Sequence, residues 1–336
     1  WSEFVQLCDP DLLTGYNINC FDLPYLNKRA MVLGLDGLCL GRLHDDYSVT
    51  RQTVFKSNQT GQRDQYETTM IGRTEFDMLR VIRSDVSISL TSYTLNKVSS
   101  EFLGDQKVEM HHSLIRQRWN EGILGRRELA VYCIKDVVLV NDLMKARKSL
   151  VQYIGQARVC GVPLSLLFKG QQQKVLAKIH HTIGPRGASA NEGFIVPMPP
   201  RNKNQTPKFK GATVIEPDPG FYAVPIATLD FASLYPSIMM AHNLCYTTWI
   251  SKKQAEQMNE DDYVITPTGD CFVKNHIRRG VLPQILEAVN KARSKAKKML
   301  NAEKSRGADA DTRTIAVLDG HQQALKIIAN SAYGFT

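Results

Sequence analysis

Strand-like and helix-like patterns of apolar residues alternate along the first part of the chain. Apolar runs such as 29–35 (RAMVLGL) fit strands, whereas longer stretches such as 126–147 (RRELAVYCIKDVVLVNDLMKAR) fit helices. From 150 to about 195 the pattern is helical. This order predicts a first α/β unit up to about residue 148 and a helical region after it.

A change of composition predicts where the second unit begins. Residues 197–211 (PMPPRNKNQTPKFKG) combine prolines, polar residues and lysines, as in an exposed connection. The following residues 212–231 fit two strands joined by the turn 217–220 (PDPG), because proline and glycine supply fixed and permissive backbone angles. The predicted domain boundaries are 1–148, 149–210, 211–281 and 282–336.

A single carboxylate, Asp230, ends the second of these strands. Residues 224–230 (VPIATLD) fit a strand buried on both faces, and Pro236 suits the first turn of a helix that continues through 237–244 (SIMMAHNL). The turn between strand and helix would direct the backbone N–H groups of residues 232–235 at one point, which suits phosphate oxygens. A magnesium ion would then link the carboxylate to the phosphates. The alternative is that Asp230 caps the helix.

The last segment, 318–336 (LDGHQQALKIIANSAYGFT), predicts a helix with two different faces. Lys326, Asn330 and Tyr333 fall at i, i+4 and i+7 and form one stripe. A solvated face more often carries Glu and Lys, so this polar and aromatic stripe indicates a ligand. The other stripe is apolar (Leu325, Ile328 and Ala329).

A basic amphipathic helix is predicted upstream, at 282–300. Arg293 and Lys297 are i, i+4 neighbours, so two cations point the same way. Together with Lys326 they favour triphosphate binding, whereas Lys295 and Lys298 fit a solvated face. The apolar stripe of this helix consists of Leu282, Ile285, Leu286, Val289, Ala292, Ala296 and Met299.

Composition and length narrow the class of protein. The 336 residues, 43% of them hydrophobic, predict a globular chain of two or three domains. A formal net charge of +9 favours an anionic partner such as nucleic acid. Seven scattered cysteines without a C-x-x-C pair indicate reduced thiols. No apolar run of about 18 residues and no signal peptide is visible, so a soluble intracellular protein without a membrane partner is expected.

Two motifs resemble those of the family B DNA polymerases. Residues 230–238 (DFASLYPSI) resemble motif A of that family, and residues 326–334 (KIIANSAYG) resemble its motif B, in the right order with basic helices between them. Residues 211–248 and 266–274 (TPTGDCFVK) are more similar to the delta branch of the eukaryotic enzymes than to the alpha, epsilon or archaeal ones.

The resemblance extends to the proofreading 3′→5′ exonuclease of the family. Residues 15–26 (GYNINCFDLPYL) look like its second motif, and residues 132–136 (YCIKD) look like its third. By this resemblance Asp22 and Asp136 would bind metal ions, since two-metal hydrolysis needs carboxylates that are gathered in space. Tyr132 lies one helical turn before Asp136 and would orient the attacking water.

The resemblance covers essentially the whole chain and implies a multidomain fold of the α/β and α+β classes. Residues 209–212 (FKGA) resemble the Y-x-G-G/A element of the family, with Phe209 in place of the usual Tyr. The implied parts are an RNase H-like exonuclease domain without its N-terminal part at 1–148, a helical linker region at 149–210, part of a polymerase palm with motif A at 211–281, and finger helices with motif B at 282–336.

The same resemblance assigns roles in the polymerase site. Asp230 would bind metal ions, and the backbone amides of Ser233 and Leu234 would bind phosphates. Tyr235 would pack under the sugar ring and leave no room for a 2′-hydroxyl, which makes it the gate against ribonucleotides. The remaining assignments are to the triphosphate (Arg293, Lys297 and Lys326) and to the nascent base pair (Asn330 and Tyr333).

Cofactors and partners are implied in the same way. Two Mg²⁺ ions are expected in each active site, with primer–template DNA and dNTPs as ligands. A sliding clamp, regulatory polymerase subunits and a nuclear location follow from the delta resemblance. An iron–sulfur cluster and zinc are expected only in a C-terminal region outside this chain.

Two motifs of the family are expected beyond the chain. An acidic D-x-E belongs before Asp22, and a D-T-D belongs after Thr336. Because the chain begins with Trp1 and stops inside a helical pattern, we expect an internal segment of a longer protein. The segment alone is predicted neither to polymerise nor to proofread, whereas its parent does both.

Two different classes of function compete with this interpretation. One is a catalytically inactive DNA-binding scaffold derived from a polymerase. Such a chain would lose its ligands at random. The residues that survive here are Asp22, Asp136, Asp230, Tyr235, Lys326 and Asn330. The second class comprises related enzymes, namely a viral or archaeal family B polymerase and a nuclease without polymerase activity.

Overall fold

The structure, a computed structural model, describes residues 1–43, 46–57, 61–85, 88–107, 110–184, 214–231 and 233–335. The chain divides into two units. Unit 1 consists of Trp1–Gln173 and Ala296–Ala324, and unit 2 consists of Lys174–Lys295 and Leu325–Thr336. The segment 209–212 and residue Ala232 lie outside the described residues.

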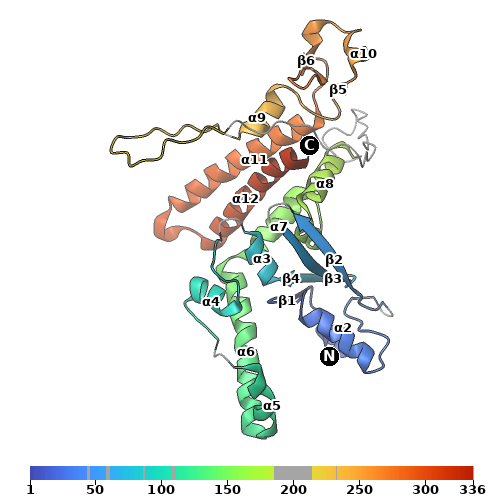
Figure 1. Cartoon of the computed structure of the whole chain (residues 1–336), viewed down its shortest axis with the longest axis vertical. Coiled ribbons are helices and arrows are strands. Elements are labelled where there is room, and N and C mark those ends of the chain that lie inside the picture. Colours follow the sequence, from blue (N-terminus) through green and yellow to red (C-terminus); the bar gives the residue numbers. More distant parts are fainter. Residues whose placement is uncertain are drawn as a thin grey trace. The chain divides into compact units, whose positions relative to one another are not determined.

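Unit 1 contains two small sheets. Strand β1 (Leu12–Gly15) pairs in parallel with β4 (Thr74–Asp77), so two segments about sixty residues apart lie side by side. Strand β2 (Thr50–Ser57) forms an antiparallel hairpin with β3 (Gly61–Thr68), visible as the long blue arrows in Figure 1. Because the two strands run parallel, their last residues, Gly15 and Asp77, lie at the same end of the pair.

Several helices contact these strands. Buried side chains of β4, α3, α4 and α6 form the core of unit 1 (Phe76, Met78, Ile82, Val98, Leu139 and Leu143). The predicted helix at 126–147 is confirmed by α6. The helices between residues 1 and 184 are α1 (Ser2–Cys8), α2 (Asp22–Val32), α3 (Met78–Ser84), α4 (Leu95–Leu103), α5 (His112–Asn120), α6 (Ile123–Ala146), α7 (Ser149–Cys160), the 3₁₀ helix η1 (Leu164–Phe168) and α8 (Gln171–Ile183), most of which belongs to unit 2.

The strand predicted at 29–35 is wrong, because most of that segment belongs to α2. Pro24 lies in the first turn of α2, where its missing N–H costs no hydrogen bond. Leu23 and Ala30 then fall seven residues apart on the buried face, while Met31 and Val32 are exposed. A short apolar run does not distinguish a strand from the end of an amphipathic helix.

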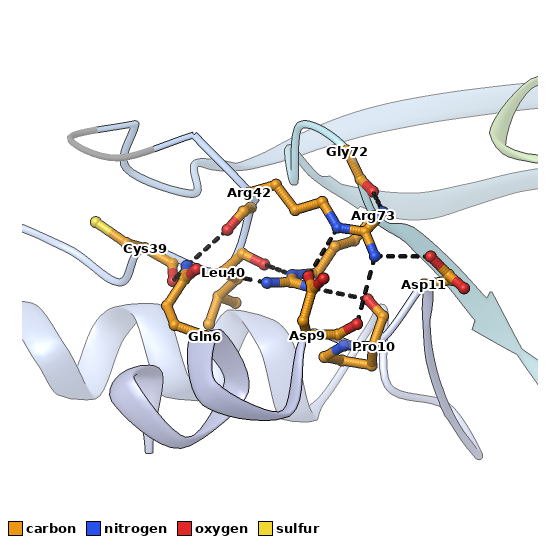
Figure 2. A network of polar contacts seen from close by, with 10 residues as sticks. Gln6, Asp9, Pro10, Asp11, Cys39, Leu40, Arg42, Gly72 and Arg73 are labelled. Carbon is orange, nitrogen blue, oxygen red and sulfur yellow. Dashed lines mark hydrogen bonds and ion pairs between the residues drawn. The ribbon is translucent and has the colours of Figure 1, made fainter.

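A buried arginine holds the first helix to the sheet region (Figure 2). The Arg73 side chain is only 1% exposed, and it donates hydrogen bonds to the carbonyl oxygens of Leu40 (2.9 Å) and Pro10 (2.8 Å). It also pairs with the carboxylate of Asp9 at 2.7 Å. Arg42 contacts the same carboxylate at 2.8 Å but lies at the surface. Arg73 therefore provides the interior part of this network.

We expect Arg73→Leu to lower the free energy of unfolding of unit 1 by about 3 kcal/mol, because two carbonyl oxygens lose their donor inside the protein. Arg42→Leu is the matched control and should cost much less, since water replaces its contacts. Thermal unfolding of both variants, followed by circular dichroism, measures the difference. Equal losses would contradict the interior role of Arg73.

Unit 2 contains a three-stranded antiparallel sheet in the order β5–β7–β6. The side chain of Asn243 links backbone groups of β7 and of the loop that precedes α11. The Asn243 amide group donates to the carbonyl oxygens of Val273 and Arg278 (2.8 Å each), and its side-chain oxygen accepts the N–H of Gly280 (2.8 Å). The elements here are α9 (Leu234–Ala241), β5 (Trp249–Ile250), α10 (Lys252–Ala255), the 3₁₀ helix η3 (Glu260–Asp262), β6 (Tyr263–Ile265) and β7 (Cys271–Val273).

The helices predicted near 282–300 and 318–336 are confirmed. They are α11 (Val281–Lys304) and α12 (Thr312–Phe335), joined through the 3₁₀ helix η4 (Gly307–Asp309). The predicted apolar stripe of α11 is buried or partly buried except for Met299, which is 50% exposed, while Leu300 is buried in its place. Among the described helices, none combines the length and the apolar character needed to cross a membrane.

The two strands predicted within 212–231 are absent from the described part, 214–231. This segment has no regular secondary structure, and Phe221 and Leu229 are 97% and 94% exposed. A β-strand forms only where a neighbour supplies partners for its N–H and C=O groups, and none of the described strands pairs with it. The helix predicted after it is confirmed, since α9 carries Pro236 in its first turn.

Candidate functional site

In unit 1, Lys107 joins the two residues of α6 that the sequence singled out. Its ammonium group lies 2.9 Å from the hydroxyl of Tyr132 and 3.3 Å from Oδ2 of Asp136, and 5.1 Å from the centre of the Tyr132 ring. The other oxygen of Asp136, Oδ1, is buried without a hydrogen-bond partner among the described residues. This oxygen could therefore accept a bond from a water or a cation.

The charge of Lys107 is stabilised by its two partners. Burial by itself would lower the pKa of Lys107, but the hydrogen bond to Tyr132 and the charge of Asp136 outweigh it and raise the pKa. The ammonium group thus stays charged at neutral pH and fixes both side chains. Sequence reasoning missed Lys107, because a single lysine in the loop before α5 carries no periodic signal.

Asp22 is the first residue of α2 and follows a turn that is held by β4. Asp77, 2% exposed, accepts the backbone N–H groups of Asn17 (2.8 Å) and Asn19 (3.3 Å) from that turn, and also the N–H of Leu79 (2.9 Å). Although Asp22 is exposed, partial desolvation raises the pKa of its carboxyl, and the charge of Asp77 raises it further. Asp77 is thus part of the electrostatic surroundings of Asp22.

A second acid of β4, Glu75, holds the same turn. It accepts a hydrogen bond from the Asn19 side chain at 2.7 Å and lies 3.6 Å from the guanidinium of Arg80. Burial raises the pKa of Glu75 to about 7, while Arg80 and Asn19 act against the shift. Glu75 and Asp77 alternate with Phe76 along the strand and so share a face. The sequence did not single out Glu75 or Asp77 as site residues, because two acids at i and i+2 are a weak signal of a functional site.

Within the described ranges, no hydrogen bond or ion pair links Asp22 directly with Asp136. No three or more His, Cys, Asp or Glu side chains of the described residues are gathered in a way that could hold a metal ion. Asp136 carries one unsatisfied buried carboxylate oxygen, and Asp22 is a separate carboxylate at the start of α2. This chemistry fits a hard divalent cation that takes further ligands from elsewhere.

In unit 2, Asp230 is exposed and makes no hydrogen bond or ion pair with a described residue. Ser233, three residues later, adopts the left-handed conformation (φ 53°, ψ 55°) and directly precedes α9. The N–H groups of Leu234 and Tyr235 lie in the first turn of α9 and have no acceptor within the helix. They are suited to bind an anion, as the sequence predicted for this turn.

Tyr235 of α9 stacks on Tyr333 of α12. Their ring centres are 3.8 Å apart and the ring planes differ by 13°. A hydrogen bond to Tyr235 raises the pKa of the Tyr333 hydroxyl. A cavity of about 470 Å³ adjoins the pair, and its other lining residues include Ile238, Met239, Trp249 and Phe272. The structure thus brings together two residues that were predicted to serve the same ligand.

The cations of the prediction lie on α11 and α12. Arg293 is partly buried, and its Nε has no hydrogen-bond partner among the described residues. Lys297 lies one turn further along α11 and is exposed. On α12, Lys326 and Asn330 are exposed. The opposite face of that helix is buried, as predicted (Leu325, Ile328 and Ala329).

Comparison with known proteins gives matches over the two parts of the chain. Residues 1–98 match the model "DNA polymerase family B, exonuclease domain", and residues 163–336 match "DNA polymerase family B". The DNA polymerase delta catalytic subunit of Bos taurus is 47% identical over 340 residues, and that of Schizosaccharomyces pombe is 46% identical over 341 residues. Both alignments include 100% of this chain but only 29% and 30% of the relatives.

A solved structure has a similar fold. The family B DNA polymerase from the hyperthermophilic archaeon Pyrobaculum calidifontis superposes with a TM-score of 0.68 and 27% sequence identity. The match covers 99% of this chain and 40% of the archaeal chain. The polymerase delta catalytic subunits are longer still, and this chain spans about three tenths of their length.

Proposed function

The chain belongs to the family B DNA polymerases, and we propose that the protein of which it is a segment copies DNA and proofreads its product. The proposed reactions are template-directed addition of dNTPs to a primer 3′ end and 3′→5′ removal of nucleotides. The observation that carries the proposal is the Tyr235–Tyr333 stack beside the first turn of α9, which follows Asp230. The stacked rings provide an aromatic surface, and the N–H groups of Leu234 and Tyr235 have no acceptor within α9, so both features suit the binding of one nucleotide.

In the proposed polymerase site, Asp230 would hold the Mg²⁺ ions, which supply charge stabilisation and activate the primer 3′-oxygen. The N–H groups of Ser233 and Leu234 would donate to phosphate oxygens, with the start of α9 adding its positive dipole end. Asn330 would line the nascent base pair. The triphosphate would be neutralised by Arg293, Lys297 and Lys326.

The unsatisfied Nε of Arg293 supports the triphosphate role, because a buried guanidinium nitrogen without an acceptor among the described residues suits an anionic ligand. Lys326 and Asn330 are one turn apart on the exposed face of α12 and can reach a ligand together. This exposed face is the one that carried the polar stripe in the sequence.

In the proposed exonuclease site, Asp22 and Asp136 would hold the Mg²⁺ ions, which would supply positive charge that activates the attacking water. Tyr132 would orient the attacking water through its hydroxyl. Lys107 keeps that hydroxyl and Asp136 Oδ2 in fixed positions, because it bonds both. Asp77 and Glu75 hold the turn that leads to Asp22.

The proposal includes the setting of the parent protein. Primer–template DNA would be bound through its phosphates in a salt-dependent way, as the net charge of +9 favours. A sliding clamp, regulatory subunits and a nuclear location are proposed from the similarity to polymerase delta catalytic subunits. Residues 1–336 alone are proposed to be inactive in both reactions, because each site would take further carboxylates from other parts of the parent.

Primer extension and primer degradation test the proposal. The full-length parent protein, with Mg²⁺ and dNTPs, should extend a labelled primer, and without dNTPs it should shorten a mismatched one. Residues 1–336 alone should do neither. A full-length protein that binds the primer–template but neither extends nor degrades it would support the scaffold function instead.

A further inference from the structure

The Tyr235 ring is only partly enclosed by the protein. Tyr235 is 48% exposed, and a cavity of about 470 Å³ lies beside it. Ile238 and Met239 of the same helix line this cavity together with Tyr235, so tight packing from that direction does not fix the ring. The parallel ring of Tyr333, with ring centres 3.8 Å apart, packs against one face of Tyr235.

A gate against a 2′-hydroxyl works only if its ring cannot yield. A ribonucleotide differs from a deoxynucleotide by one hydroxyl group, and a ring that can move aside accommodates it at little cost. Two stacked aromatic rings resist such a displacement by the energy of their contact. The rigidity of Tyr235 is therefore a property of the stacked pair.

On this basis we propose that Tyr333 is a positioning residue for sugar selection: its ring holds Tyr235 in place and so sets the discrimination against ribonucleotides. This inference rests on the proposed function and assigns to Tyr333 a role apart from contact with the base pair.

Two kinds of variant separate the ring from the hydroxyl. Tyr333→Leu removes the ring and should reduce the ratio of kcat/KM for a dNTP to that for the matching rNTP by roughly fivefold, the factor that a stacking contact accounts for. The change should appear mainly as a lower KM for the rNTP. Tyr333→Phe keeps the ring and should retain the ratio within about twofold.

The experiment uses the full-length parent protein and single-nucleotide incorporation on a primer–template. Tyr333 is 44% exposed, so leucine opens no buried cavity; if that variant does not fold by circular dichroism, Tyr333→Met replaces it. In a Tyr235→Ala background, Tyr333→Leu should produce no further loss of sugar selection, because the gate is already gone.

The outcomes are distinct. A normal sugar ratio in Tyr333→Leu, with increased misincorporation of wrong dNTPs, would overturn the proposal and leave Tyr333 with a base-pair role only. An additional loss in the Tyr235→Ala background would also overturn it, since Tyr333 would then act independently of the gate. A wild-type protein that incorporates no dNTP would refute the proposed function itself.

Discussion

Asp230→Asn should reduce DNA synthesis by the full-length protein on the order of a thousandfold while its exonuclease activity stays within about twofold of wild type. The substitution keeps the size of the side chain and removes the charge that would hold Mg²⁺ beside the triphosphate. No described residue pairs with Asp230, so the loss would come from the missing ligand and leave the fold intact.

The matched control is Asp218→Asn, an exposed acid in the same irregular segment, 214–231. It should extend primers at the wild-type rate, because no phosphate-binding turn follows it. Primer extension under dNTP excess, together with degradation of single-stranded DNA, measures both activities for each variant. If Asp230→Asn and Asp218→Asn extended primers equally well, the proposed polymerase site would be wrong, and helix capping would not explain Asp230 either, because the N-cap of α9 is Ser233.

Asp136→Asn should have the opposite effect: loss of 3′→5′ degradation on the order of a thousandfold, with primer extension within about twofold of wild type. The unsatisfied Oδ1 of Asp136 is the atom expected to contact the metal ion, and an amide there is a poorer ligand. Asp142→Asn is the matched control on the same helix, where Asp142 makes a 3.7 Å contact with Lys145.

A substitution of Lys107 tests whether this residue positions Tyr132 and Asp136 for the exonuclease reaction. Lys107→Met keeps the length of the side chain but removes the contacts to Tyr132 and Asp136, and we expect roughly a tenfold loss of degradation. Rate measurements across pH should show a larger loss for Asp136→Asn than for Lys107→Met at every pH. A Lys107→Met enzyme as active as wild type would leave Lys107 without a function in the reaction.

Helices of this protein were predictable where one face is apolar. The predicted patterns at 282–300 and 318–336 lie within or largely within α11 and α12, and the predicted apolar residues are buried or partly buried except for Met299, which is exposed. The strand at 29–35 was wrong because the helix that starts at Asp22 reaches into it. The strands in 212–231 were wrong for the described part because a strand depends on a partner that no local pattern specifies.

The residues of the candidate sites were predictable where they belong to a sequence motif. Asp136 and Tyr132 lie one turn apart on α6, and Tyr235 precedes Pro236 in the first turn of α9, as the sequence indicated. Their neighbours were not predictable. Lys107 reaches Asp136 across 29 residues, and Asp77 holds Asn17 across 60.

The family motifs and the helices that carry them could be read from the local sequence, because contacts between residues three or four apart follow from helix geometry alone. The distant groups that meet these residues became known from the three-dimensional fold: Lys107 beside Tyr132 and Asp136, and Tyr333 against Tyr235. Such contacts depend on how separate elements pack, and burial of the groups then sets their charge, as for Glu75 in β4.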